Sequence, residues 1–545
     1  MNRRVCLARA WAVASLFLVT WAGCSSHSER YGLRELGVAP QQVHEIEPLE
    51  LKKAEPNEPS REPNKPPEKV ELSLPESRAW ALENNLQLKT ALINPAIAGA
   101  ALSVEEAKFE ASFFANLNGS KINQPAIGAL GQISGSQSES LGGDFGVQVP
   151  LRTGGTVTFD ASDQWNKTNA LGLQSQSYWV SNASVSISQP LLRNAGQRAT
   201  MYSIRVAAYN RDIVDTRTRL EVINVLAALD RVYWRLYAAR RELEVRQQQY
   251  ELAQTQLQRA RRLVDGGKAP QVEIIRAEAG VADQLQAIII ADNNLRDRER
   301  ELKRVLHKAG LDIQTPTIVI PTTTPDPVRY VMDRPRLVSD AIQNRMELLE
   351  LQLQLLQDAG AIDFARNQTL PIATLGYTYN IPAFGATQNE DLEMLFEHEF
   401  YGHTGRLQMV IPLGNEAAKS RLRQSIYTRR QRLATRANRE DVVRQEVLNA
   451  VDQVEANWQR ILAARQTSIL NGRLYEAEQR QFEQGMRTST DVLNAQARFA
   501  NAQSEEIRAL ADYQISLVDV AYATGTLLGS AKVRWEPIVP ETDVE

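Results

Sequence analysis

The same succession of sequence patterns occurs twice in this chain, once before and once after about residue 325. Each copy predicts a helix, amphipathic strands, a very long helix, a tight tip and a returning helix. Three pairs of segments match: 81–84 with 341–344, 189–191 with 411–413, and 267–277 with 485–495. A duplication of this length means that one architectural unit is used twice. The function should therefore belong to the assembled unit rather than to an isolated pocket.

The distance between matching positions differs along the two copies. The first matching segments are 260 residues apart, those at Pro190 and Pro412 are 222 apart, and those at Gly267 and Gly485 are 218 apart. The first copy therefore carries 38 additional residues in its strand region. The long helices and their tips kept nearly the same length, so helix length is the constrained quantity.

Residues 1–23 predict a secretory signal peptide. Three arginines lie within the first nine residues, and residues 10–21 are almost wholly apolar. Ala22-Gly23-Cys24 resembles a bacterial lipobox, so Cys24 is expected to become the lipidated first residue of the mature chain; a plainly cleaved signal is the alternative. An uncleaved anchor is disfavoured because the apolar run is short for crossing a bilayer.

The composition excludes several classes of protein. The only other cysteine, Cys6, lies in the signal, so no disulfide or thiolate metal site is expected. The formal net charge is −3, which becomes −6 without the three arginines of the signal, and no basic block could hold a nucleic acid. Residues 24–70 are expected to form a lipidated N-terminus followed by a disordered linker rich in Pro and Glu.

Two stretches predict exceptionally long helices. Between Gly196 and Gly266 lie 69 residues without glycine or proline, and between Gly414 and Gly485 lie 70 with a single glycine. Both are dense in Ala, Leu, Gln, Glu and Arg, the strong helix formers. Such a helix is roughly 100 Å long. A segment without proline leads back from each tip: 271–309 and 486–524. The chain should therefore form long antiparallel helical hairpins.

A heptad repeat runs along the first long helix and predicts coiled-coil packing. One series recurs every seven residues and is accompanied by valine or alanine on the adjoining position: Leu229, Leu236, Leu243, Tyr250, Leu257 and Val264, with Val225, Val232, Ala239, Ala253 and Ala260. The small side chains allow helices to lie close together. A rod-like coiled coil without a pore would explain these heptads equally well.

Alternating apolar and polar residues predict four strands: 113–117, 184–188, 375–381 and 407–411. Segments of about ten residues are long enough to cross a bilayer in a tilted barrel. Four strands cannot close a barrel, so several chains would have to contribute. Aromatic residues near strand ends are typical of membrane interfaces: Trp165, Tyr178, Trp179, Tyr377, Tyr379, Phe396, Phe400 and Tyr401. A soluble sandwich would show the same alternation.

The 38 additional residues predict an extra β-hairpin at about 143–165, with its turn at 152–155. The sequence leaves three positions open for this hairpin. It could lengthen the barrel, cap it, or lie on its periplasmic side.

Strands placed between duplicated helical hairpins, behind an export signal, resemble the outer-membrane efflux protein family typified by TolC. The most specific segments are the tips at 485–495 and 267–277 and the corners at 188–192 and 411–414. The resemblance covers about residues 72–529 and implies an α+β membrane protein that forms a homotrimer. A twelve-stranded barrel in the outer membrane, with four strands from each chain, would continue into an α-helical tunnel across the periplasm. The first repeat would span 71–325, the second 326–530, and a C-terminal tail 531–545.

The resemblance also implies functional residues at the tips. Arg487 and Asp491 on the second tip and Glu273 on the first would close the periplasmic gate, because an arginine can pair with two carboxylates in a weak, reversible latch. Gly267, Gly485 and Thr488 would lie where an adaptor docks. The alternative for Arg487 and Asp491 is an acidic residue at a helix N-terminus beside a solvated neighbour.

The function that the resemblance implies is an outer-membrane channel that extends into the periplasm. It would passively conduct substrates from an inner-membrane pump and a periplasmic adaptor, in a tripartite efflux or type I secretion system. No cofactor, metal or catalytic site is predicted; His398 and His403 are poorly spaced as ligands and have no third nitrogen nearby. The alternative is a non-conducting, lipid-anchored coiled-coil scaffold in the periplasm.

Overall fold

The computed structural model describes residues 69–127, 133–169, 176–267, 269–484 and 486–535. The predicted signal peptide, Cys24, nearly all of the predicted linker, Gly485 and residues 536–545 lie outside the described residues.

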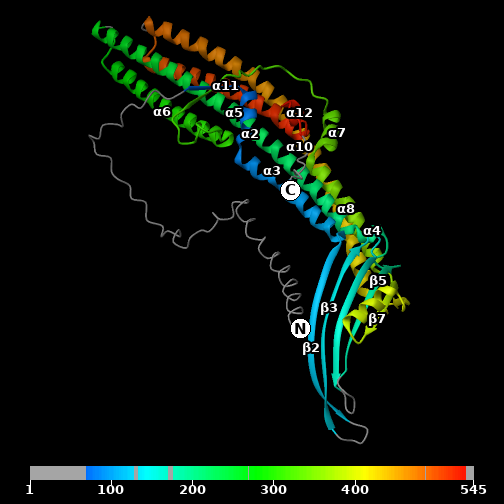
Figure 1. Ribbon diagram of the computed structural model, residues 1–545. Coiled ribbons are helices and arrows are strands. Elements are labelled where there is room, and N and C mark those ends of the chain that lie inside the picture. The colour runs from blue at the N-terminus through cyan, green and yellow to red at the C-terminus, as the bar shows by residue number, and fades with distance from the viewer. Residues whose placement is uncertain (1–68, 128–132, 170–175, 268, 485, 536–545) are drawn as a thin grey trace, which may run out of the picture. The chain divides into compact units, whose positions relative to one another are not determined.

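Each predicted copy folds into two short helices, strands, one long helix and a returning helix (Figure 1). The first contains α2 (Leu74–Asn84), α3 (Leu86–Glu106), the 3-10 turn η3 (Ala107–Phe109), four strands, α4 (Gln197–Thr200), α5 (Tyr202–Asp265) and α6 (Val272–Leu306). The second contains α7 (Arg334–Asn344), α8 (Met346–Gln368), β7 (Ile372–Gly385), α9 (Gln388–Glu397), β8 (Gly402–Val410), α10 (Glu416–Glu483), α11 (Ser489–Ala523) and α12 (Leu527–Ser530). The prediction of duplicated long hairpins is confirmed.

The long helices begin and end where glycine permits a change of direction. Gly196 and Gly414 precede α5 and α10 with φ angles of 82° and 83°. The two helices contain 64 and 68 residues, which corresponds to about 100 Å each. Within the described residues, no helix is both long and apolar enough to cross a membrane.

The described helices lie side by side as a wall with two edges (Figure 1). Toward the tips the order of contact is α6, α5, α11, α10; toward the sheet it is α3, α5, α8, α10. Helix α5 therefore lies inside the wall, α6 and α3 form one edge, and α10 forms the other.

The predicted heptads pack as expected only along part of α5. Leu229 and Leu236 are fully buried against α6. Nearer the tip, Tyr250, Leu257 and Val264 are only partly buried, and Gln496 Nε2 of α11 donates to the Gln249 carbonyl of α5 at 2.8 Å. Near the tips, small and polar residues of α5 and α11 therefore form the contact between the two repeats.

Six strands form one antiparallel sheet in the order β2, β3, β4, β5, β7, β8. The first four are β2 (Ser112–Ile127), β3 (Ile133–Pro150), β4 (Thr156–Asn169) and β5 (Gln176–Pro190). Strand β5 of the first repeat pairs with β7 of the second, so Ile187 lies opposite Tyr377. Helix α9 packs against β5 and β7, where Asp391 accepts a hydrogen bond from the Ser181 amide at 3.3 Å.

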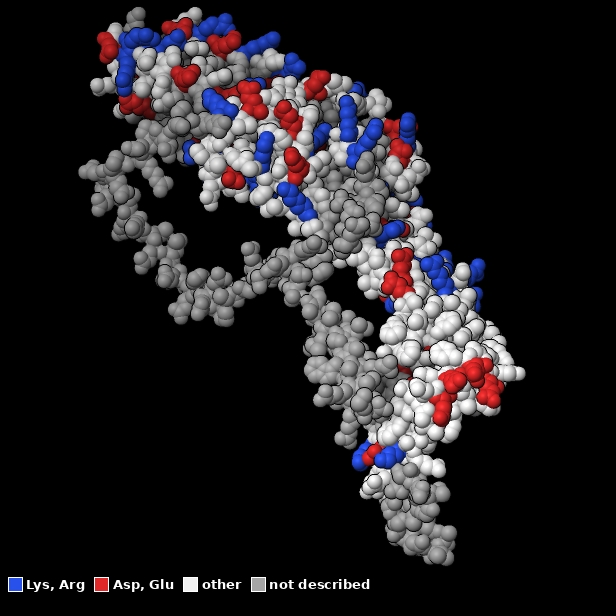
Figure 2. Space-filling view, viewed as in Figure 1, with Lys and Arg blue, Asp and Glu red and all other residues white. Residues whose placement is uncertain are grey.

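The sheet has one apolar and one polar face, because its register keeps residues of the same kind opposite each other. The apolar face carries large side chains: Phe113, Leu117, Leu141, Phe145, Val147, Val157, Phe159, Trp165, Trp179, Val185, Ile187, Tyr377, Tyr379, Ile381 and Leu407. Figure 2 shows charged residues gathered over the helices and sparse over the strands of the visible face.

The predicted extra hairpin is present as β3 and β4, and it lies inside the sheet between β2 and β5. The expectation of four strands from each chain is therefore wrong for this chain, because the described sheet has six. The family resemblance supplied the number four, whereas the 38 additional residues supply two further strands.

A two-stranded parallel pairing outside the large sheet was not predicted. Strand β1 (Lys69–Leu72) pairs in parallel with β6 (Ile318–Pro321), and Leu72 and Val319 are fully buried against α5 and α6. This pairing ties the start of the first repeat to the segment that leads into the second. Strands of four residues give too little alternation to be recognised in a sequence.

Candidate functional site

The second tip is closed by a capping box at the start of α11. The Asp491 carboxylate accepts from the Thr488 amide at 3.0 Å and from its hydroxyl at 2.8 Å, while the Thr488 hydroxyl caps the Asp491 amide. This reciprocal pattern satisfies backbone donors that the first helical turn leaves free. The first tip turns at Gly267, whose φ of 70° suits glycine.

Glu273 joins the two tips within one chain. Its carboxylate accepts hydrogen bonds from both the amide and the hydroxyl of Ser489, the first residue of α11. Arg276, one turn along α6, forms an ion pair with the same carboxylate. Glu273 is only 6% exposed and Ser489 is fully buried. The carboxylate also lies at the N-terminus of α11, where the helix dipole favours negative charge.

The environment of Glu273 keeps it ionised. Burial opposes the charged form, but the hydrogen bonds from Ser489 and the ion pair with Arg276 outweigh it and lower the pKa of the Glu273 carboxyl. Hydrogen bonds from Thr488 likewise lower the pKa of Asp491. Both tips therefore carry a carboxylate at neutral pH.

Arg487 contacts its own hairpin. Its Nε lies 3.0 Å from Gln481 Oε1 and 3.2 Å from Glu478 Oε2, both on α10. About half of the Arg487 side chain is exposed. The structure therefore does not bring Arg487, Asp491 and Glu273 together in one cluster, and the latter two each stabilise the start of α11.

The first and second hairpins approach closely just behind the tips. A Cβ on Gly280 of α6 would lie 2.7 Å from Leu493 Cδ2 of α11. Gly472 of α10 makes a similar approach to Phe499 of α11, at 3.1 Å. A side chain at either glycine would require the facing Leu493 or Phe499 side chain to shift, so both glycines allow close packing of these helices.

A second polar site lies at the joint where the first helix of each repeat is interrupted. Asn85 separates α2 from α3, and its Nδ2 donates to the Val305 carbonyl near the end of α6 at 2.8 Å. Arg345 separates α7 from α8, and its Nη1 donates to the Ala523 carbonyl at the end of α11 at 3.3 Å. Matching positions in the two repeats thus bind the free C-terminal carbonyls of the two returning helices.

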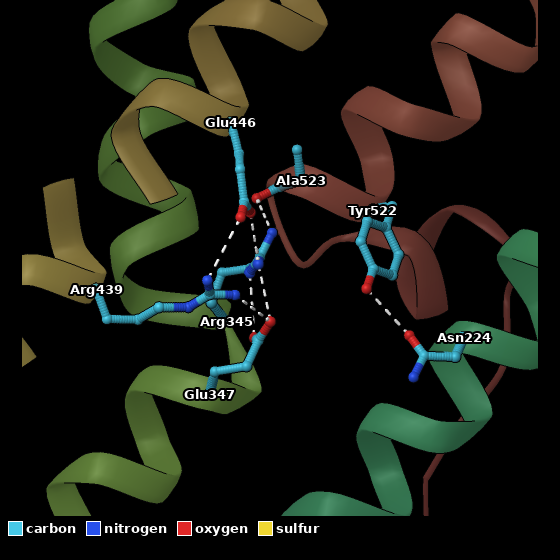
Figure 3. Close-up of polar contacts among 7 residues, drawn as sticks. All are labelled: Asn224, Arg345, Glu347, Arg439, Glu446, Tyr522 and Ala523. Atoms are coloured by element: carbon cyan, nitrogen blue, oxygen red, sulfur yellow. Dashed lines mark hydrogen bonds and ion pairs between the residues drawn. The ribbon is translucent and has the colours of Figure 1, made fainter. Parts of the chain in front are cut away.

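In the second repeat this joint is a charged cluster (Figure 3). Arg345 Nη2 lies 2.8 Å from Glu347 and 2.7 Å from Glu446, and Arg439 contacts both carboxylates. The Arg345 side chain is only 4% exposed. Its guanidinium lies 5.7 Å from the Tyr522 ring, and the Tyr522 hydroxyl donates to Asn224 Oδ1 of α5 at 3.0 Å. The cluster joins α8, α10 and α11, and Tyr522 extends it to the first repeat.

A sequence profile of the outer membrane efflux protein family matches residues 155–307 and 337–526, which together make up more than half of the chain. The chain belongs to the outer membrane efflux protein family. The matched residues begin in the turn between β3 and β4, so α2, α3, β2 and β3 lie outside the match. Membership in this family assigns the chain to transport and places it in the outer membrane.

One related protein and two solved structures illustrate this similarity. The chain is 22% identical over 354 residues to the outer membrane protein TolC of Vibrio cholerae serotype O1, which covers 64% of this chain and 77% of that protein. The CmeC outer membrane channel of Campylobacter jejuni superposes with a TM-score of 0.61 at 16% identity, over 83% of this chain and 86% of CmeC. The outer membrane protein VceC of V. cholerae superposes with a TM-score of 0.60 at 13% identity, over 83% and 96%.

Within this family fold, the residues predicted from sequence occupy the tips, whereas the joint was missed. Thr488 and Asp491 bond to each other at the start of α11, and Glu273 bonds to Ser489, the first residue of that helix. The contact between Glu273 and Ser489 joins residues more than 200 positions apart, and no local pattern could reveal it. Arg345 could have been found from its alignment with Asn85 in the repeat.

The histidines considered as metal ligands have other partners in the structure. His403 Nδ1 lies 2.8 Å from the Tyr377 hydroxyl, and His398 Nδ1 lies 2.9 Å from the Phe396 carbonyl oxygen. Across the described part of the chain, no three His, Cys, Asp or Glu side chains are grouped so that they could hold a metal ion.

Proposed function

We propose that three copies of this chain form a passive outer-membrane channel, which receives exported substrates from a periplasmic adaptor and an inner-membrane pump. This proposal rests on one observation. Along both edges of the described structure, from the sheet to the tips, the strands and helices have no neighbour on their outer side. One edge consists of β2, α3 and α6, and the other of β8 and α10. A ring that joins one edge of each copy to the opposite edge of the next satisfies all of them.

The edge helices carry apolar seams that have no partner among the described residues. On α6 and α3 the exposed side chains lie at coiled-coil spacing: Ile275, Leu285 and Ile289, and Leu86, Ile93, Ile97 and Val104. On α10 the corresponding exposed residues are Leu448, Leu462 and Ile469, separated by multiples of seven. Opposing seams of this kind are suited to helix packing between copies.

The sheet supports insertion into a bilayer. Trp165 lies opposite Trp179 at one level, and Ile187 lies opposite Tyr377 at another. Eight residues separate these levels along β5, about 27 Å. Between them the face carries Phe159, Val185 and two alanines, and its polar pair Asp163 and Ser181 is bonded to Gln388 and Asp391 of α9. This agrees with the apolar band of outer-membrane barrels and its flanking aromatic residues. An open sheet edge is not tolerated in lipid, so the barrel must close between copies.

The tips are proposed to form the periplasmic gate and the adaptor-docking surface. Arg487 is half-exposed, although its partner Glu478 on α10 is mostly buried. We propose that the exposed part of the guanidinium can also reach a carboxylate of a neighbouring copy. Gly267, Gly485 and Thr488 mark the turns that an adaptor would reach. Cys24 is proposed as the lipidated residue that adds a second membrane attachment to the barrel.

Purified full-length protein tests the proposal in planar bilayers. We expect a heat-modifiable trimer with ion conductance, and we expect Arg487→Ala or Asp491→Ala to increase that conductance. A folded protein that forms no trimer and conducts no ions would instead support the coiled-coil scaffold. Conductance that is unchanged in both variants would remove the gate assignment while leaving the channel in place.

A further inference from the structure

We infer that three copies close a barrel of eighteen strands, in which β8 of one copy pairs with β2 of the next. The inference rests on the proposed trimer, and it specifies the strand number and the diameter of the barrel. Its starting point is the position of the extra hairpin. Strands β3 and β4 lie between β2 and β5 and pair with them along their full length, so they are part of the wall and cannot act as a cap.

The hairpin presents the same two faces as the rest of the sheet. Phe145, Val147 and Phe159 lie on the apolar face. On the polar face, Asp144 accepts from Asn116 Nδ2 of β2 at 2.6 Å, and Asp160 accepts from Ser184 Oγ of β5 at 2.7 Å. The hairpin is thus bound to both neighbours through polar side chains. Its other face is mainly apolar, as suits lipid, and its one acidic residue there, Asp163, is bonded to Ser181 and to Gln388 of α9.

The turn of the hairpin is fixed at the helical end of the sheet. The Gly196 amide, directly before α4, donates to the Thr153 carbonyl at 2.9 Å, and the Thr153 hydroxyl donates to Gln189 Oε1 at 2.9 Å. Gly154 has a φ of 94°, and a Cβ at this position would lie 2.4 Å from the Asn194 carbonyl oxygen. The turn is therefore built into the corner where β5 leads to α5.

The two edge strands are complementary. Strand β2 follows α3 and leads away from the helices, whereas β8 leads back toward α10, so β8 and a neighbouring β2 would be antiparallel like every other pair in the sheet. Within one copy the outer sides of both strands are unpaired. Phe113 and Leu117 of β2 and Leu407 and Met409 of β8 are all exposed, as expected before assembly.

Six strands from each copy make the barrel wider than the helical wall requires. Barrel diameter grows roughly in proportion to strand number. With neighbouring strands about 4.8 Å apart and tilted by about 40°, eighteen strands give a backbone diameter of about 36 Å, against about 24 Å for twelve. Barrels of this size leave an aqueous channel. The barrel would then not restrict large solutes, and size selection would fall to the helical tips.

Spin labels on the polar face measure this diameter in the assembled trimer. Ser186→Cys on β5 provides one label in each copy, since Cys6 lies in the predicted signal peptide and Cys24 is the proposed lipidation site. Three equivalent labels in an eighteen-stranded barrel should be about 31 Å apart, whereas a twelve-stranded barrel would give about 21 Å. The matched control removes residues 133–169. That deletion takes out β3 and β4, keeps β2 and β5 antiparallel, and should shift the distance to the shorter value.

The outcomes separate this inference from the proposed function. A conducting trimer with labels about 21 Å apart in the full-length chain would overturn the eighteen-stranded barrel and leave the channel intact. Should the deletion variant fail to fold, disulfide crosslinking replaces it. Met409→Cys combined with Phe113→Cys, Ala115→Cys or Leu117→Cys should yield covalent trimers for at least one pair. Crosslinking at none of the three pairs, in a protein that remains trimeric, contradicts the pairing of β8 with β2.

Discussion

At the scale of single residues, the tips depend on a carboxylate that serves a neighbouring helix. Glu273 lies on α6 but its acceptor atoms satisfy the first donors of α11. Hydrogen bonds to a charged group contribute more than those between neutral groups, and a buried donor left without its acceptor is costly. The loss of one charge here should therefore loosen both tips together.

Glu273→Gln is expected to weaken the contact between the tips. The amide retains an acceptor oxygen but loses the charge that pairs with Arg276 and the α11 dipole, so we expect a cost of about 2 kcal/mol. Hydrogen exchange at the start of α11 should accelerate roughly 30-fold through local opening. Glu278→Gln is the matched control, because Glu278 forms only an exposed pair with Arg261. Equal exchange in both variants would contradict the bridging role of Glu273.

The same carboxylate predicts how the tips respond to pH. Because the folded-state pKa of Glu273 is lowered below its ordinary value of 4.5, its stabilising contribution is complete above that value and is lost as the pH falls through the folded pKa. The distance between spin labels at Glu278→Cys and Arg498→Cys should stay constant from pH 7 to 5 and increase at lower pH. Ser489→Ala removes one stabilising hydrogen bond, so the increase should begin at higher pH. A transition near pH 6 in the parent would assign the change to another group.

At the scale of elements, the joints hold the returning helices against the interrupted ones. Asn85 performs this with a neutral amide, whereas Arg345 uses a buried charge shared with two carboxylates. Arg345→Ala leaves Glu347 and Glu446 with Arg439 as their remaining partner, and we expect a loss of about 3 kcal/mol. Urea unfolding of the solubilised protein should show a lower midpoint.

Two further variants interpret that measurement. Arg345→Lys keeps the charge but cannot reach Glu347, Glu446 and the Ala523 carbonyl with a planar group, so it should recover only part of the loss. Arg334→Ala removes a pair of exposed ion contacts with Asp452 and Glu455 and should change stability by less than about 1 kcal/mol. An Arg345→Ala midpoint equal to that of Arg334→Ala would show that the cluster does not stabilise the joint.

The long elements were predictable because their signals are local. Runs without proline and with at most one internal glycine set the limits of α5, α6, α10 and α11 to within a few residues. The contact between Glu273 and Ser489 and the cluster at Arg345 depend on which helices meet, which no single segment encodes. The strand count failed because the resemblance supplied a number that the inserted residues had changed. The hairpin itself was visible in the alternation around residues 145–159.

At the scale of the whole molecule, the two repeats present opposite and different edges. The first repeat ends at α6, α3 and β2, and the second at α10 and β8. Such a contact is heterologous, because one edge binds the other and neither binds itself. The two described repeats of one chain do not close into a ring by themselves. Further copies are therefore needed to complete the structure.

Charged substitutions on the two edges test this arrangement. Ile97 of α3 is 62% exposed and Leu462 of α10 is 48% exposed, so aspartate at either position should leave the chain folded but desolvate a charge at the interface. Ile97→Asp alone and Leu462→Asp alone should each abolish the trimer, as measured by native mass spectrometry at unchanged helical content by circular dichroism. Ile97→Leu, which keeps the apolar contact, should remain trimeric. When the two aspartate variants are mixed, the intact α10 edge of the first meets the intact α3 edge of the second, so heterodimers should form that cannot close into a ring. If both variants stay trimeric, or if the mixture yields no heterodimer, the contact between these two edges is wrong.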